Sequence, residues 1–314
     1  MSLYTVVIVD YGTLPRTLQY IQDFVNKCDD ADKASFVIID NYNKNDRVQR
    51  RNSIGCTEKS SLYSGWHGNE LPVYNIRENT FLIATEHNLG YAKANNIGAL
   101  FSNDIIHSKY VLFSNNDIKF PKRFSLKTLS KNFELHTDCF MIGPEVLGLD
   151  CKRQGPVLYD DTIFDLIFRS YSIVKIFKQP SVTRPPSDFQ YGRVHHVVGC
   201  FMLTDIEQFI KVGMFDENTF LYFEENILSE RAKAYHLYYY YDSFLRIIHE
   251  GGGTVQKKVS SISQDKLFFE SACYYCREYK RAPLALILLC KLNFHFFYIA
   301  LKNIKSIFTI IKKA

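Results

Sequence analysis

Four short runs rich in β-branched and aromatic residues, each followed by a polar turn, constrain the fold of this chain most strongly. The runs comprise residues 4–10, 35–40, 81–85 and 109–114. Between them, apolar residues recur at helical spacing, as in residues 15–28. Strands that alternate with helices predict an α/β fold with a Rossmann-like, mainly parallel central sheet and flanking helices.

Polar residues follow these strands at the edge where such sheets bind ligands. They are Asp10, Asp40, Asn88 and Asp117. Because the carboxyl ends of parallel strands meet at one edge, four polar residues there indicate a binding site. The sequence contains neither a G-x-G-x-x-G segment nor a P-loop, which argues against dinucleotide-binding Rossmann enzymes and Walker ATPases.

The second half of the chain continues the alternation less regularly. Expected elements are a helix over 161–178, a proline-containing link, a strand over 197–203, and helices over 205–212 and 224–231. Residues 43–80 are polar and are expected to form loops around a short strand.

The domain organisation follows from these elements. We expect a catalytic domain over 1–265, with a nucleotide-binding half over about 1–120 and an acceptor-binding half over about 121–265. A helical, basic extension covers 266–314.

Positive charge is concentrated in this extension. The 314 residues include 38 Lys and Arg against 33 Asp and Glu, yet no acidic residue follows Glu278. The lysines from Lys291 to Lys313 fall on one helical face, which predicts a basic amphipathic helix. Such helices bind anionic membrane surfaces, and the apolar run 282–290 is too short to span a bilayer. The alternative is that the helix docks on the catalytic domain or on a second subunit of a homo-oligomer.

The compartment follows from the N-terminus and the cysteines. No secretory signal is recognisable, and the eight cysteines are scattered through the chain, unlike a disulfide framework. We expect a cytoplasmic protein, peripheral on the inner face of the cell membrane.

Three constellations could carry chemistry. The strand-terminal run Asn115-Asn116-Asp117 suits a divalent cation, or it forms an Asx-turn that ends the strand. The pair Glu224-Glu225 could supply a general base, or it is the ordinary acidic first turn of a helix. His249, followed by Glu250 and three glycines, could reach a metal or phosphate, or it is a histidine with local partners.

Six motifs occur in an order that is similar to that of family 2 glycosyltransferases. They are Val-Val-Ile-Val-Asp-Tyr, Ile-Ile-Asp-Asn, Asn-Leu-Gly-Tyr-Ala-Lys-Ala-Asn-Asn-Ile-Gly, Val-Leu-Phe-Ser-Asn-Asn-Asp, Gly-Met-Phe-Asp-Glu with Leu-Tyr-Phe-Glu-Glu, and Ile-Ile-His-Glu-Gly-Gly. The resemblance covers residues 4–281 and is strongest to the rhamnosyltransferase-like branch of bacterial surface-polysaccharide enzymes. It implies a GT-A fold, a nucleotide-sugar donor, a divalent metal (Mg²⁺ or Mn²⁺) and inversion at the anomeric carbon.

The resemblance also implies roles for individual residues. Those expected to bind the nucleotide are Tyr11, Asp40, Asn88, Gly90, Lys93, Asn95, Asn115 and Arg277. Asp117 and His249 match the metal ligands, and Asn115 replaces the first aspartate of the D-x-D motif, so the metal has one fewer charged ligand. Glu225 matches the aspartate of the family's base motif, with Glu224 as the alternative base. Gly199 and Cys200 lie where the acceptor site begins.

The implied partners are a UDP- or dTDP-sugar, a lipid-linked saccharide acceptor and, through the extension, an anionic membrane; nucleic acid is not expected. Two alternatives stay open. The replacements at Asn115 and Glu225 are compatible with a nucleotide-sugar-binding protein without turnover. A sugar nucleotidyltransferase would need a glycine-rich basic loop after the first strand, which residues 10–14 do not supply.

Overall fold

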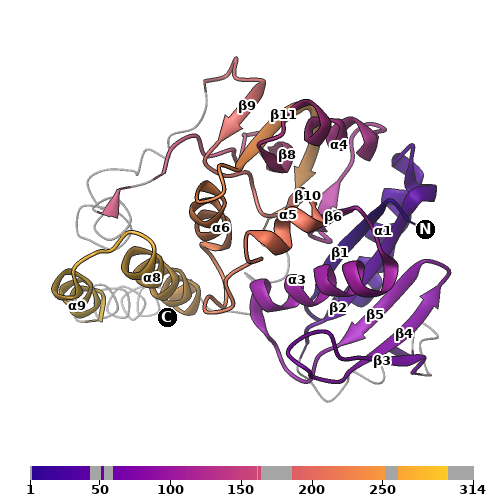
Figure 1. Cartoon of the computed structure of the whole chain (residues 1–314), viewed down its shortest axis with the longest axis horizontal. Helices are drawn as coiled ribbons and strands as arrows, with labels where there is room; N and C mark the ends of the chain where they lie inside the picture. The colour runs from indigo at the N-terminus through magenta and orange to yellow at the C-terminus, as the bar shows by residue number, and fades with distance from the viewer. Residues whose placement is uncertain are drawn as a thin grey trace, which may run out of the picture.

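A computed structural model describes residues 2–42, 51–52, 59–160, 162–163, 186–251 and 261–295. An eleven-stranded sheet with helices on both faces forms the body of the protein (Figure 1). The helix expected over 161–178 and the extension beyond residue 295 lie outside the described residues. None of the described helices is both long and apolar enough to cross a membrane.

The four strands predicted from the first half of the sequence form a parallel unit in the order β5-β2-β1-β6. They are β1 (Tyr4–Asp10), β2 (Ala34–Asp40), β5 (Thr80–Ala84) and β6 (Tyr110–Ser114). All seven residues of β2 are buried, which explains why its sequence is continuously apolar rather than alternating. The register pairs Asp10 with Asp40, so both carboxylates lie at the same edge.

Antiparallel strands extend this unit at both sides. On one side β4 (Leu71–Arg77) pairs with β5 and with β3 (Ser61–Tyr63). On the other, β10 (Phe201–Asp205) lies between β6 and β8 (Cys139–Leu147). Beyond β8, and parallel to it, lies β11 (Tyr238–His249), which pairs antiparallel with β7 (Ile118–Lys119) and β9 (Tyr191–Val194).

The sequence did not reveal β8 and β11. Gly143 and Pro144 interrupt β8, and such a pair ordinarily marks a turn. Here Pro144 pairs with Asp242, where the register of β11 shifts through a bulge, so the missing N–H of the proline is tolerated. The strand expected over 197–203 begins only at Phe201, because residues 199–200 form a turn.

Helices cover the two faces of the sheet. On one face α1 (Leu14–Lys27) and α4 (Leu126–Leu135) pack on a core that includes Ile8 and Phe24. On the other face lie α3 (Gly90–Phe101), α5 (Ile206–Lys211) and α6 (Glu224–Lys233). Short helical turns at Ala31–Lys33 and Ser102–Ile106 follow α1 and α3. The α/β fold class predicted from the sequence is confirmed.

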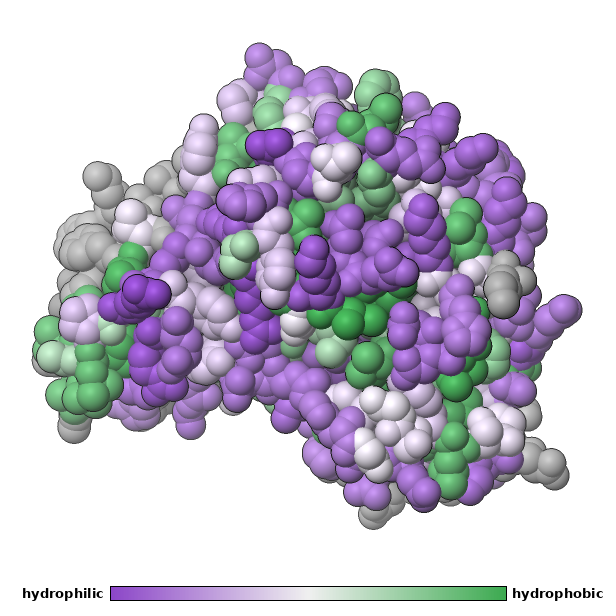
Figure 2. Space-filling model, in the orientation of Figure 1, coloured by the Kyte–Doolittle hydropathy of each residue, from purple (hydrophilic) through white to green (hydrophobic). Residues whose placement is uncertain are grey.

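A third apolar cluster joins α8 (Ser261–Glu278) and α9 (Leu284–Asn293) to α6. Phe269 of α8 stacks on Phe294, and Tyr275 contacts Phe223 at the start of α6. The domain boundary expected at residue 265 therefore falls inside α8. On the outside of α9, Leu284, Leu288, Leu289 and Leu292 are more than half exposed, and the region of α9 appears green in the space-filling view (Figure 2).

Candidate active site

A cavity of about 440 Å³ opens where β6, β10, β11 and α6 converge. Six predicted site residues line it together, although they come from four separate parts of the chain. They are Asn115, Gly199, Cys200, Glu224, Glu225 and His249. The remaining lining is mainly aromatic and aliphatic, so the cavity combines a few polar groups with an apolar wall.

Asp117 and His249 meet at one end of this site. Nε2 of His249 lies 3.3 Å from the buried Oδ1 of Asp117, and Nδ1 of His249 lies 2.7 Å from Oε1 of Gln154. Since a carbonyl oxygen only accepts, Nδ1–H must donate to Gln154, and the lone pair of a neutral Nε2 then faces the carboxylate. The lone pair of His249 Nε2 and the carboxylate of Asp117 repel each other unless a cation, either a proton or a metal ion, lies between them.

The donor set fits a divalent metal. One carboxylate oxygen and one imidazole nitrogen are common ligands of Mn²⁺, and the second imidazole nitrogen is oriented by Gln154, as expected for a metal-bound histidine. When the proton is the cation, the hydrogen bond and charge of His249 outweigh the burial that opposes ionisation, so the pKa of Asp117 is lowered. Asn116, between Asn115 and Asp117, donates to the hydroxyls of Thr13 and Thr17.

Glu224 and Glu225 occupy the first turn of α6, as predicted. Burial, followed by the charge of Glu225, raises the pKa of Glu224 to about 8. Burial also raises the pKa of Glu225, whose charge in turn contributes to the raised pKa values of Tyr91 and Tyr239. Burial and the charge of Glu225 therefore both favour the protonated form of Glu224.

Strained backbone precedes the two glutamates. Tyr222 and Phe223 have φ values of 76° and 70°, a left-handed conformation that bulky residues rarely adopt. Phe268 of α8 packs on both rings, and Ser271 donates to the carbonyl of Leu221. Helix α8 thus stabilises the turn that directs Glu224 and Glu225 into the cavity.

The loop before α3 supports the part of the cavity wall that Tyr91 forms. Gly90 has φ +82°, and a Cβ there would meet the carbonyl oxygen of Phe220 at 2.3 Å. This close approach lets Tyr91 donate its N–H to Phe220, while its hydroxyl donates to the carbonyl of Gly199 at 2.6 Å. Sequence reasoning missed Tyr91, although it lies inside the most specific motif.

Gly199 is needed for the position of the base. A Cβ at Gly199 would meet Oε1 of Glu225 at 1.8 Å, so the carboxylate lies directly against the backbone of the Gly199–Cys200 turn. The N–H of Asn115 donates to the carbonyl of Cys200, which ties this turn to the end of β6.

The other predicted nucleotide-binding residues do not line the cavity. Asp40 is buried at the end of β2, with Arg51 3.9 Å away, and Tyr11 contacts the ring of Tyr42 edge-on. Asn88 accepts from the N–H of Gly90 and from Asn41. In α3, Lys93 is half-buried and Asn95 donates to the carbonyl of Tyr91. In α8, Arg277 is about half exposed beside Glu278.

Asn41, which sequence reasoning also missed, holds the loop before α3. Its Nδ2 donates to Asn88 and to the carbonyl of Gly90, while its Oδ1 accepts from the N–H of Leu89. A polar residue directly after the second strand was the available signal.

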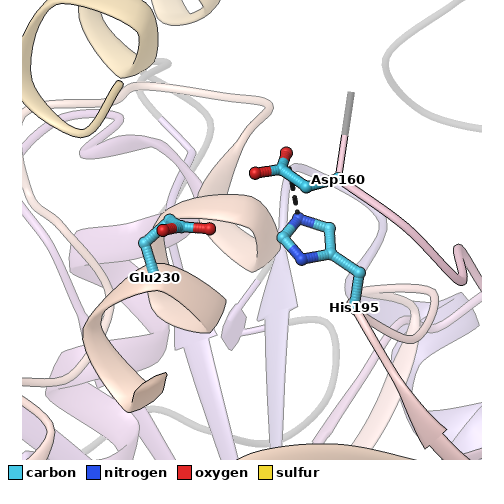
Figure 3. A group of neighbouring side chains, drawn as sticks. All are labelled: Asp160, His195 and Glu230. Carbon is cyan, nitrogen blue, oxygen red and sulfur yellow. Dashed lines mark ion pairs between the residues drawn. The ribbon is translucent and has the colours of Figure 1, made fainter. Parts of the chain in front are cut away.

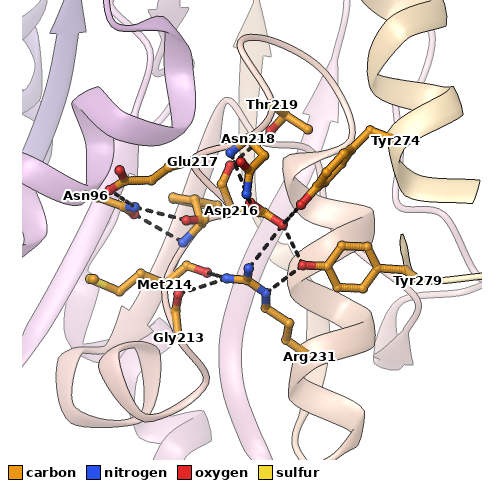
Figure 4. Close-up of polar contacts among 11 residues, drawn as sticks. Asn96, Gly213, Met214, Asp216, Glu217, Asn218, Thr219, Arg231, Tyr274 and Tyr279 are labelled. Carbon is orange, nitrogen blue, oxygen red and sulfur yellow. Dashed lines mark hydrogen bonds and ion pairs between the residues drawn. The ribbon is translucent and has the colours of Figure 1, made fainter. Parts of the chain in front are cut away.

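A buried network joins the loop before α6 to helix α8 (Figure 4). The carboxylate of Asp216 accepts from the hydroxyls of Tyr274 and Tyr279 and lies 3.1 Å from a guanidinium nitrogen of Arg231. Burial opposes ionisation of Asp216, but these hydrogen bonds outweigh it and lower its pKa. The neighbouring Glu217 accepts from Asn96, so the Phe-Asp-Glu motif is structural rather than catalytic.

A second cluster of metal-ligand type lies behind α6 (Figure 3). Asp160, His195 and Glu230 have ligand atoms within 4.8 Å of one another. Lys280 forms ion pairs with both carboxylates, at 3.5 Å from Glu230, and Tyr275 donates to Asp160. Lys280 thus already supplies a positive charge to this cluster.

Comparison with known proteins gives one curated relative. The chain is 23% identical over 205 residues to the low-salt glycan biosynthesis hexosyltransferase Agl10 of Haloferax volcanii, which covers 64% of this chain and 62% of the relative. The chain thus spans less than two thirds of the length of the curated relative that it matches. No protein-family model matches the chain.

Two solved structures resemble the whole architecture. One is GalNAc-T7 with UDP, GalNAc and Mn²⁺, at 13% identity and a TM-score of 0.51, covering 90% of this chain and 52% of that one. The other is the mannosyltransferase PcManGT of Pyrobaculum calidifontis with GDP-Man and Mn²⁺, at 12% identity and a TM-score of 0.50. The match covers 94% of this chain and 70% of that one. The chain has the GT-A fold.

The GT-A fold confirms the architecture that the motif order implied. Its parallel strands β2, β1 and β6 end at Asp40, Asp10 and Ser114, and the metal-type motif follows β6 directly. The narrower assignment to the rhamnosyltransferase-like branch stays a prediction.

Proposed function

We propose that this protein is an inverting glycosyltransferase that moves a hexose from a nucleoside-diphosphate sugar to a hydroxyl of a saccharide acceptor. One observation supports this most directly: on a GT-A fold, a single site combines the charged carboxylate of Glu225 with the Asp117–His249 pair. A base and a pair of metal ligands at one site are what sugar transfer from a diphosphate requires.

In this proposal Glu225 accepts the proton of the acceptor hydroxyl. The hydroxyl oxygen forms the new bond to the anomeric carbon, and the bond from that carbon to the diphosphate oxygen breaks, with its electron pair leaving on the diphosphate. Attack from the side opposite the leaving group inverts the configuration. Burial raises the pKa of Glu224, which favours the form that adds no second negative charge beside the base.

Asp117 and His249 would hold Mg²⁺ or Mn²⁺, with Asn115 as a neutral neighbour. The metal supplies Lewis-acid stabilisation of the charge that develops on the diphosphate, an effect of roughly several kcal/mol. The residues Tyr11, Asp40, Asn88, Gly90, Lys93 and Asn95 would bind the nucleotide of a UDP- or dTDP-sugar, and Arg277 would approach the diphosphate. Gly199 and Cys200 would border the acceptor.

We further infer that the acceptor is lipid-linked and that the protein acts in surface polysaccharide synthesis at the cytoplasmic face of the membrane. The exposed leucines of α9 support this, because they stand next to Arg281 and Lys291 in a segment without acidic residues. Apolar side chains flanked by basic ones bind the interface of anionic bilayers.

A donor screen tests the proposed activity. Purified protein is incubated with UDP-, dTDP- and GDP-sugars, with Mg²⁺, Mn²⁺ or EDTA, and release of nucleoside diphosphate is measured. We expect metal-dependent release, and NMR of the transferred product should show inverted anomeric configuration. The variant Asp117→Ala should lose metal-dependent donor binding, whereas Asp23→Ala on the exposed side of α1 should not.

Two results would contradict parts of this proposal. Tight donor binding without release or transfer would instead support a binding protein without turnover. Equal donor affinity with and without metal, in the parent and in Asp117→Ala, would remove the metal from the proposal.

Cosedimentation with liposomes tests the membrane part. The triple variant Leu284→Gln, Leu288→Gln, Leu292→Gln should bind phosphatidylglycerol liposomes more weakly than the parent, with an unchanged melting temperature since these side chains are exposed. Raised salt should weaken the parent's binding as well. Binding that is insensitive to both changes would exclude α9 as the membrane contact.

A further inference from the structure

His196 is a polar residue on the cavity wall that the mechanism does not use. It lies in the segment before the Gly199–Cys200 turn, on the same cavity as Glu225. Its carbonyl accepts from the N–H of Val157 at 3.0 Å, and its own N–H donates back to Val157 at 3.2 Å. This β-bridge fixes the backbone on which the imidazole is carried.

The tautomer of His196 follows from one contact. Nδ1 lies 3.0 Å from the carbonyl oxygen of Val197. A carbonyl oxygen only accepts hydrogen bonds, so Nδ1 carries the proton and Nε2 carries a lone pair. Among the residues that the structure describes, no hydrogen-bond partner is found for this Nε2.

The ring is neutral under physiological conditions. Burial, together with the neighbouring His195, lowers the pKa of His196 to about 4. A group with so low a pKa is a poor proton acceptor at pH 7, so His196 is not a second general base. Its Nε2 can still accept a hydrogen bond from a ligand bound in the cavity that His196 lines.

The cavity thus presents two hydrogen-bond acceptors to a ligand. Glu225 provides a carboxylate and His196 an imidazole lone pair, beside the rings of Tyr222 and Phe268. We propose that His196 Nε2 accepts a hydrogen bond from a second hydroxyl of the saccharide acceptor, one that does not react. His196 is then a binding residue that selects acceptors by this hydroxyl, an inference that builds on the proposed function.

The first test measures transfer kinetics with methyl hexopyranosides of gluco, galacto and manno configuration and with their monodeoxy analogues. His196→Leu should raise the KM for the acceptor about tenfold, the value of one hydrogen bond. His196→Gln, whose carbonyl can replace Nε2, should recover most of the loss. In the parent, one monodeoxy analogue should show the same loss, and His196→Leu should no longer distinguish it.

His67→Leu is the matched control, because His67 is exposed and pairs with Glu217 away from the cavity. It should leave the KM for the acceptor unchanged. Full acceptor affinity in His196→Leu, or equal loss in His196→Gln, would overturn the proposal.

A second measurement does not depend on turnover. In two-bond ¹H–¹⁵N spectra of histidine-labelled protein, assigned with His196→Gln, Nε2 of His196 should be unprotonated and should shift when a methyl hexopyranoside is added. A protonated Nε2, or no shift with any of the three sugars, would overturn the assignment. If the shift occurs but no donor supports transfer, the proposed function fails while the binding role of His196 holds.

Discussion

At the residue scale, the candidate site contains two adjacent glutamates with unequal environments. Glu224 is almost completely buried, whereas Glu225 is half-buried against Gly199. Burial raises the pKa of both carboxyl groups, and the charge of Glu225 raises the pKa of Glu224 further.

The first prediction separates these two residues. Glu225→Gln should lower kcat by ~10²–10⁴-fold with little change in donor affinity, because it removes the proton acceptor from the chemical step. Glu224→Gln should retain most of the activity, since burial and the charge of Glu225 favour the protonated form of Glu224. Steady-state kinetics and donor titrations of both variants measure this, and the reverse pattern would make Glu224 the base.

The second prediction concerns Gly199. Gly199→Ala should lower kcat about as strongly as Glu225→Gln, because the new methyl group occupies the position of the Glu225 carboxylate. The clash is with the end of a flexible side chain, so the fold should persist with only a small change in melting temperature. Unchanged kcat in a folded variant would show that the carboxylate does not act from this position.

At the scale of elements, α8 determines whether the catalytic turn is held in place. The turn at Tyr222 and Phe223 is strained by roughly 1–3 kcal/mol per residue, and such strain persists only where the surroundings compensate for it. Compensation comes from the aromatic contacts with Phe268 and from the network around Asp216.

The third prediction tests this network. Arg231→Ala should lower the free energy of unfolding by about 2 kcal/mol, because it removes charged hydrogen bonds and leaves the buried Asp216 without its cation. Lys233→Ala, which removes a surface pair with Glu230, should cost less than ~1 kcal/mol. Urea unfolding of both variants provides the measurement. Equal losses would mean that the network adds nothing beyond a surface ion pair.

At the scale of the whole molecule, the buried glutamate makes stability depend on pH. The pKa of Glu224 is 4.5 in an unstructured chain and about 8 in the fold, so the folded state binds more protons between these values. Its contribution to stability is therefore present below pH 4.5 and is lost as the pH rises toward 8.

The fourth prediction follows from this direction of the pH dependence of stability. The stability of the parent should fall relative to Glu224→Gln as the pH rises from 5 to 8, by at least about 1 kcal/mol. Glu78→Gln, at an exposed turn, should follow the parent at every pH. Urea unfolding at four pH values provides the test, and parallel curves for the parent and Glu224→Gln would contradict the raised pKa.

The sequence by itself determined the parallel half of the fold and most of the candidate site. Strands 4–10 and 35–40 can be predicted because strands that are buried on both faces are continuously apolar and because turn residues mark their ends. Asp117 could be predicted because it follows a recognisable strand, and the two glutamates because they begin a recognisable helix. His249 was singled out by the order of the motifs.

Only the tertiary structure decided the rest. Gly143 and Pro144 read locally as a turn, yet pairing with β11 through a bulge makes them part of a central strand. The raised pKa of Glu224 depends mainly on burial, which no local pattern predicts. Local patterns specify backbone preference, whereas burial and long-range contacts determine which side chains are charged, which atoms lack a partner, and which groups share one cavity.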